Sequence, residues 1–165
     1  MAMVNLTEVR ERVTEYFDQM HPEGAPCGTY GMKPGHKGAS MYASLDYALI
    51  RKVMGDDLRV VLSGEERQQW VDHINSFCTP DGKYPHKNEF HANGMAVCAL
   101  SALGGRRPRA FPRYREFDAV DKIAPWLERL NWASFWRASH DFWGGMLPYS
   151  LLDRCTDEWR GVLLD

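Results

Sequence analysis

Apolar residues recur every three or four positions along most of the chain, which is the spacing of one face of an α-helix. Segment 5–20 carries such a stripe, and segment 63–77 carries another that includes Trp70, Val71 and Ile74. Polar residues occupy the opposite faces. The pattern predicts an all-α protein with helices over residues 5–20, 40–54, 63–77, 91–103, 118–130 and 140–152.

Capping and turn residues mark the expected ends of these helices. Ser63 with Glu66 three residues later has the pattern of a capping box. The sequence Thr79-Pro80-Asp81-Gly82 predicts a turn, because proline ends helical geometry and glycine can adopt a positive φ. Pro148 predicts a kink or an early break in segment 140–152.

The helices pair into three hairpins, at residues 5–55, 63–105 and 118–153, within a single domain over residues 1–165. Their first helices begin near residues 5, 63 and 118, so the unit repeats at roughly 50 to 58 residues. Thr156 and the acidic residues after it predict the start of a further helix. We therefore expect the chain to be the N-terminal portion of a longer helical array.

Segment 62–105 resembles the repeat of the terpenoid cyclase and protein prenyltransferase superfamily. It contains a capped helix, Asp81-Gly82 followed by the aromatic Tyr84, a polar loop, and an Ala-rich helix that ends at Leu103-Gly104. Cys78 stands where such repeats usually carry glutamine, and the chain has no DxDD motif, which argues against protonation-initiated triterpene cyclisation. The resemblance implies an α/α toroid, of which three hairpins would form about half.

Three histidines lie near the expected starts of the second helices of the hairpins, which would form the inner wall of a toroid: His36, His91 and His140. Helix starts present unpaired N–H groups that favour anions, and histidine exchanges protons near neutral pH. We predict that the three approach one mouth of the cavity. His91 and His140 would be catalytic proton-transfer residues, and Asp141 would be a third catalytic residue that orients His140.

Seven aromatic residues lie from Trp126 to Tyr149. Such rings stabilise carbocations or stack on sugars. Trp126 belongs to the apolar stripe of its helix and is expected in the core. Trp136 and Trp143 flank His140 and Asp141 and are expected to line the cavity. The predicted substrate-binding residues are Tyr42, Tyr84, Asn93, Trp136 and Trp143.

Metal and anion sites have weaker support in the sequence. His86, His91 and His140 could meet at a metal, but no HExxH or similar ligand pair is present, so we predict neither a metal nor another cofactor. Segment 106–115 contains five arginines. Such a run is typical of a solvated loop, and the alternative is a loop that binds a diphosphate or an acidic glycan.

Composition excludes several classes of partner. A net charge of -2 and a pI near 6.3 give no field that would attract nucleic acid or an anionic membrane surface. No apolar run approaches the roughly 20 residues that span a bilayer. The four cysteines form no CxxC pair, which favours free thiols in a reducing compartment. We expect a soluble, cytoplasmic protein.

Three functions stay open from the sequence. The resemblance favours a domain that binds or acts on an isoprenoid or a similar apolar small molecule in an aromatic cavity. One alternative is a carbohydrate-active domain similar to polysaccharide lyases or glycoside hydrolases, with a glycan ligand. The other is a non-catalytic helical-repeat domain that binds a partner. The ring would be completed by a second copy or by a covalently continuous C-terminal half.

Overall fold

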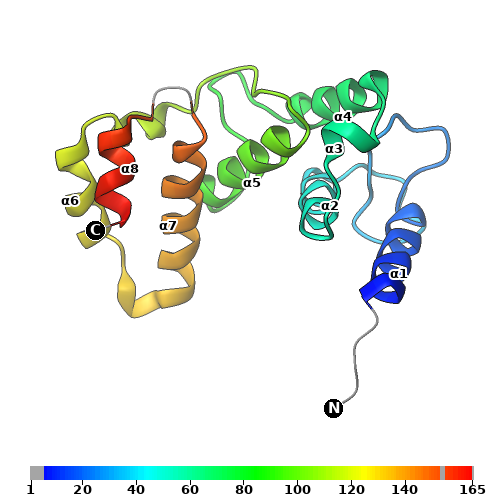
Figure 1. Cartoon of the computed structure of the whole chain (residues 1–165), viewed down its shortest axis with the longest axis horizontal. Helices are drawn as coiled ribbons and strands as arrows, with labels where there is room; N and C mark the ends of the chain where they lie inside the picture. The colour runs from blue at the N-terminus through cyan, green and yellow to red at the C-terminus, as the bar shows by residue number, and fades with distance from the viewer. Residues whose placement is uncertain (1–5, 153–154, 165) are drawn as a thin grey trace, which may run out of the picture. The chain divides into compact units, whose positions relative to one another are not determined.

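The computed structural model describes residues 6–152 and 155–164, and every regular element in this part is a helix, as predicted. The chain divides into two compact units. The first unit is the chain up to Ser76 together with Ala102–Gly105, and the second unit is Phe77–Ser101 and the chain from Arg106 onward. The α-helices (Figure 1) are α1 (Leu6–Asp18), α2 (Met41–Val53), α3 (Leu58–Val61), α4 (Gly64–Ser76), α5 (Glu89–Ala102), α6 (Ile123–Glu128), α7 (Phe135–Ser150) and α8 (Asp157–Leu164), and the 3-10 helices are η1 (Pro112–Phe117), η2 (Val120–Lys122) and η3 (Trp132–Ser134).

The capping box predicted before α4 is confirmed. The backbone N–H of Ser63 donates to a carboxylate oxygen of Glu66 at 2.8 Å, and the backbone N–H of Glu66 donates to the Ser63 hydroxyl at 3.2 Å. Each bond satisfies an N–H that has no partner within the helix. Asn5, the predicted start of the first helix, lies outside the described residues. Helix α3 was not predicted, because its four residues are too few to show a period.

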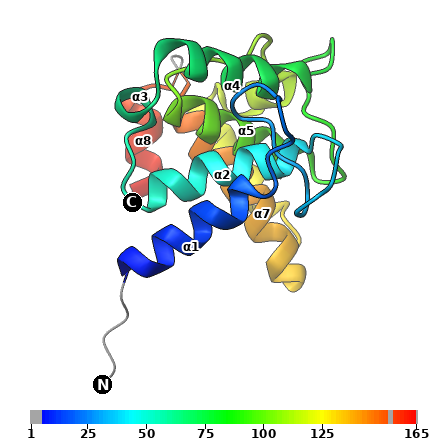
Figure 2. The same cartoon turned by 90° about the vertical axis from the view of Figure 1, so that its right-hand side faces the viewer.

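An aromatic cluster forms the core of the first unit. Helices α1 and α2 lie side by side (Figure 2), and the rings of Phe17 and Tyr47 stack with centroids 4.1 Å apart. Tyr47 also contacts Trp70 of α4 at 5.9 Å. The indole of Trp70 covers Gly28, where φ is +86° and a Cβ atom would lie 2.1 Å from Trp70 Cγ. Glycine is therefore required under this tryptophan.

The second unit departs from the predicted helix over residues 118–130. That segment contains η2 and α6, a helix of only six residues. Pro125, the third residue of α6, is the reason. The first N–H groups of a helix have no carbonyl partner, so proline fits there, whereas a helix that began at residue 118 would place Pro125 in its interior.

Helix α7 begins at Phe135, five residues before the predicted start at His140, and it continues through Pro148. Proline lacks the N–H that would bond to the carbonyl four residues earlier, which belongs to Gly144. The hydroxyl of Tyr114, from η1, donates to this carbonyl at 3.1 Å. The predicted break at Pro148 is therefore wrong, because a tertiary hydrogen bond replaces the missing helical one.

Two glycines bring α5 and α7 into backbone contact. A Cβ atom at Gly94 would lie 2.8 Å from the Cα of Gly144, and a Cβ atom at Gly144 would lie 2.4 Å from the carbonyl carbon and oxygen of Phe90. No side chain larger than hydrogen fits at this crossing. The small residues of the second helices thus allow close packing, as the sequence indicated.

Aromatic side chains fill the space around this crossing. The ring of Phe117 meets Trp126 edge to face at 4.9 Å, and Tyr149 of α7 contacts Trp159 of α8 at 4.8 Å. The prediction that Trp126 belongs to the core is confirmed, since it is 4% exposed. The buried cluster consists of Phe90, Val97, Phe111, Tyr114, Phe117, Ile123, Trp126, Met146, Tyr149, Cys155 and Trp159.

The predicted turn after α4 is also present. The N–H of Gly82 donates to the carbonyl of Thr79 at 2.9 Å, and φ of Gly82 is +81°. A Cβ atom at Gly82 would lie 2.0 Å from the carbonyl oxygen of Ala110, so the turn packs directly on the backbone of the segment before η1. None of the helices in residues 6–152 and 155–164 has the length and apolarity needed to cross a membrane.

Gly144→Ala is expected to lower the free energy of unfolding by about 3 kcal/mol, because the new methyl group meets backbone atoms that cannot move aside. Gly161→Ala in α8 is the matched control, since nothing lies within 4 Å of its Cβ position, and we expect a gain of about 0.5 kcal/mol. Urea unfolding followed by circular dichroism measures both. Equal stability of the two variants would contradict the close crossing.

Gly82→Ala is expected to destabilise more than Gly35→Ala. Both glycines have positive φ, +81° and +73°, so alanine costs about 1–2 kcal/mol at either position. Only Gly82 adds a clash, because nothing lies within 4 Å of the Cβ position at Gly35. Thermal unfolding of the two variants separates strain from packing, and losses of the same size would show that the turn does not pack on Ala110.

Candidate functional site

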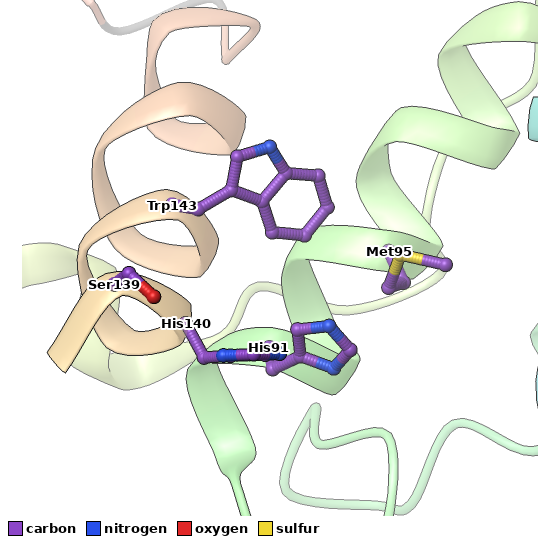
Figure 3. A pocket seen from close by; sticks show the side chains of 5 residues that line it. All are labelled: His91, Met95, Ser139, His140 and Trp143. Atoms are coloured by element: carbon purple, nitrogen blue, oxygen red, sulfur yellow. The ribbon is translucent and has the colours of Figure 1, made fainter. Parts of the chain in front are cut away.

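The second unit contains a groove of about 310 Å³ between α5 and α7. His91 and Met95 line it from α5, and Ser139, His140 and Trp143 line it from α7 (Figure 3). His91 and Met95 are four positions apart on α5, and Trp143 lies three and four positions after His140 and Ser139 on α7, so each set lies on one side of its helix. The groove therefore joins two imidazoles, an indole, a thioether and a hydroxyl in one hollow.

The glycine crossing explains why these side chains meet. His91 precedes Gly94 by three residues and His140 precedes Gly144 by four, so each histidine lies about one turn from the point of contact. The imidazole centroids of His91 and His140 are 4.7 Å apart, and the rings of His91 and Trp143 are 5.7 Å apart. The structure thus brings together three of the predicted site residues.

The backbone of α7 fixes the orientation of His140. Its Nδ1 lies 2.6 Å from the carbonyl oxygen of Trp136, and a carbonyl can only accept, so Nδ1 carries the hydrogen. In the neutral ring, Nε2 is then the proton acceptor. The Trp136 ring lies 4.6 Å from the imidazole, although it is 78% exposed and does not line the groove.

Asp141 does not orient His140, contrary to the prediction. Asp141 lines a separate polar hollow of about 390 Å³, together with Arg113, Arg137 and the residues around the start of α5. The carbonyl of Trp136 has the orienting role that the sequence assigned to the carboxylate.

His91 is half-buried, like His140. It lies in the first turn of α5, as predicted, and its backbone N–H donates to the Asn88 side chain at 2.9 Å. Burial lowers the pKa of His91, and the neighbouring His140 and His86 lower it further, so its imidazole is neutral at pH 7. His140 lies inside α7 rather than at its start, so the predicted helix-end position is wrong for this residue.

Two predicted residues belong to the first unit and do not line this groove. His36 lies in the exposed loop before α2, with Nδ1 3.0 Å from the carbonyl oxygen of Gly38. Tyr42 is in the first turn of α2 and half-buried, and burial and then Asp46 raise its pKa to about 12. The groove of the second unit is therefore built without either side chain.

Asn93 and Tyr84, the other two predicted substrate-binding residues, are buried and do not line this groove. Both are 0% exposed. The Asn93 amide donates to the carbonyl of Glu89 at 2.9 Å and accepts from Arg107 at 2.9 Å. The Tyr84 ring lies under the guanidinium of Arg107, at 5.5 Å. These side chains hold the turn of Gly82 to α5.

Arg107 shows how the arginine-rich segment is used. Its guanidinium donates to the carbonyl of Gly82 and lies 5.7 Å from the Phe111 ring and 6.0 Å from the Tyr114 ring. Arg113 covers the ring of Phe90 at 4.1 Å. At least two of the five arginines thus have structural roles, which the sequence did not distinguish from solvated ones.

Met95 and Ser139 were not predicted as site residues. Each lies four positions from a predicted one, His91 and Trp143 respectively, so helical spacing could have identified them. In the described residues, no group of three His, Cys, Asp or Glu side chains is arranged to hold a metal ion.

Comparisons of the chain with protein-family models, curated proteins and solved structures gave no match. The resemblance to the terpenoid cyclase and prenyltransferase superfamily stays a prediction.

The midpoint of the His91 titration is expected below the ordinary value of 6.5, and His140→Gln should raise it by removing a neighbouring positive charge. Burial remains in this variant, so the midpoint should stay below 6.5. Asp141→Asn, the control, should leave it unchanged. Histidine ring NMR signals measure all three, and a midpoint above 6.5 in the unchanged protein would contradict the half-buried pair.

Because the unfolded chain protonates His91 more readily, this residue should reduce stability as the pH falls below about 6.5.

Proposed function

We propose that the second unit binds an isoprenoid or a similar apolar small molecule in the groove between α5 and α7, and that the imidazole pair exchanges a proton with this ligand. The observation that carries the proposal is the contact of His91 with His140, at 4.7 Å, in the same hollow as Trp143. Paired titratable groups in a hollow with apolar walls are typical of sites that transfer protons.

The groove suits a small apolar ligand. Its volume of about 310 Å³ is near the lower end for small-molecule sites, and Met95 and Trp143 supply an adaptable thioether and a flat indole. The open side of the groove would allow a longer ligand to extend along the helices.

The two imidazoles support proton exchange because their environments differ. His91 is half-buried and neutral, so it can accept a proton from the ligand. His140 has Nδ1 bonded to the backbone and can exchange a proton at Nε2. A charge on His140 opposes a charge on His91 and lowers the pKa of His91.

The indole of Trp143 supports a ligand that becomes positively charged during reaction. The face of an indole attracts a cation, by about 1 kcal/mol or more when water is excluded. This property, together with the resemblance of segment 62–105, favours an isoprenoid. Indoles also stack on sugars, so a carbohydrate ligand is the second candidate.

Isothermal titration calorimetry with farnesol, farnesyl diphosphate and a set of neutral and acidic oligosaccharides tests the proposal. We expect the isoprenoids to bind, and Trp143→Ala to weaken binding about tenfold through lost apolar contact. Trp132→Ala is the matched control, because Trp132 lies in the same unit on η3 and does not line the groove. His91→Gln should retain binding and slow any conversion that mass spectrometry detects.

The other possible results of the calorimetry would favour a carbohydrate ligand, a different binding site or a non-catalytic domain. Binding of an oligosaccharide and of no isoprenoid would support the carbohydrate ligand instead. Binding that Trp143→Ala and Trp132→Ala reduce equally would place the ligand outside the groove. No binding of any probe would contradict the proposal and favour a non-catalytic helical-repeat domain.

A further inference from the structure

The first unit contains a second, larger hollow, of about 690 Å³, along the line where α1 and α2 meet. Its walls are almost entirely apolar, and several of the side chains are well exposed: Val9 is 46% exposed, Tyr16 49% and Val53 87%. Val13 and Ile50 continue the same surface. A contiguous apolar surface of this kind marks an interaction site more often than a free surface.

Two charged residues of opposite sign interrupt this surface, Arg12 on α1 and Asp46 on α2. Arg12 contacts Glu8 at 2.6 Å, in an exposed pair of the kind that contributes little. No described residue forms a hydrogen bond or an ion pair with the half-buried carboxylate of Asp46. A carboxylate partly removed from water without a cation is costly, so this position favours a partner that brings one.

The arrangement of the charges suits a second copy of the same surface. Helices α1 and α2 are antiparallel, since Phe17 stacks on Tyr47 while Arg10, nearer the start of α1, pairs with Asp56 beyond the end of α2. In a two-fold interface each contact occurs twice, with the two residues exchanged between the copies. A surface with one cation and one anion on its two helices can therefore complement itself.

We propose that the chain forms a homodimer in which the α1–α2 groove of one copy packs on that of the other, with Arg12 of each copy against Asp46 of its neighbour. Each helix has 13 residues and is about 20 Å long, so the interface is small. We expect a dissociation constant in the micromolar range that rises with salt. The proposal is independent of the ligand groove in the second unit.

Sedimentation equilibrium of the whole chain, from micromolar to near-millimolar concentration, tests the dimer. Val53→Lys should weaken it about tenfold or more, because a charge would enter the apolar interface. Val60→Lys is the matched control, since Val60 is 78% exposed on α3 and does not line the groove. Both sites are exposed, so loss of folding cannot explain a difference.

Charge reversal tests the proposed ion pair. Asp46→Arg and Arg12→Asp should each weaken the dimer about tenfold, and the double variant should restore it to within about threefold of the unchanged protein. A monomer at every concentration would overturn the proposal and leave a basic amphipathic helix as the next occupant to test. Equal effects of Val53→Lys and Val60→Lys, or a double variant weaker than either single one, would overturn it as well.

Discussion

The contact between Gly94 of α5 and Gly144 of α7 is the constraint on which the second unit depends. A Cβ atom at either position would lie within 3 Å of the backbone of the other helix, so the two helices meet without side chains between them. At that distance, residues one turn away from the crossing are forced together. His91 and His140 are two of them, and Trp143 directly precedes Gly144, so the candidate site is a direct consequence of the glycine pair.

Polar bonds to backbone carbonyls make this crossing possible. The hydroxyl of Tyr114 satisfies the carbonyl that Pro148 leaves without a helical partner, so α7 continues as one helix past the crossing. The guanidinium of Arg107 joins the carbonyl of Gly82 to the amide of Asn93, and three aromatic rings surround it. These contacts of the half-buried guanidinium tie the turn and α5 into one structure.

The sequence predicted what depends on local chemistry. The capping box of Ser63 and the turn at Gly82 are present because each requires only a few neighbouring residues. The helix over 118–130 was wrong because Pro125 limits where a helix can begin, a local rule that the apolar stripe concealed. The continuity of α7 could not be predicted, because it rests on a hydrogen bond from Tyr114, 34 residues before Pro148.

At the candidate site, too, local signals could be predicted and contacts between distant residues could not. His91, His140 and Trp143 were identified by their place near the second helices, and the crossing brings them together. Asn93 and Tyr84 do not line the groove, because both contact Arg107, and a sequence does not show which side chains an arginine will contact. The orientation of His140 by the backbone of Trp136 has no sequence signal, since any residue supplies a carbonyl.

The most direct test of the account is whether the rings of His91, His140 and Trp143 are in contact in solution. Nuclear Overhauser effects between the imidazole protons of His91 and the ring protons of the other two residues measure this. The structure predicts cross-peaks to both rings in the unchanged protein and their loss in Gly144→Val, where α5 and α7 cannot approach. The absence of both cross-peaks in a folded, unchanged protein would contradict the glycine crossing and the site built on it.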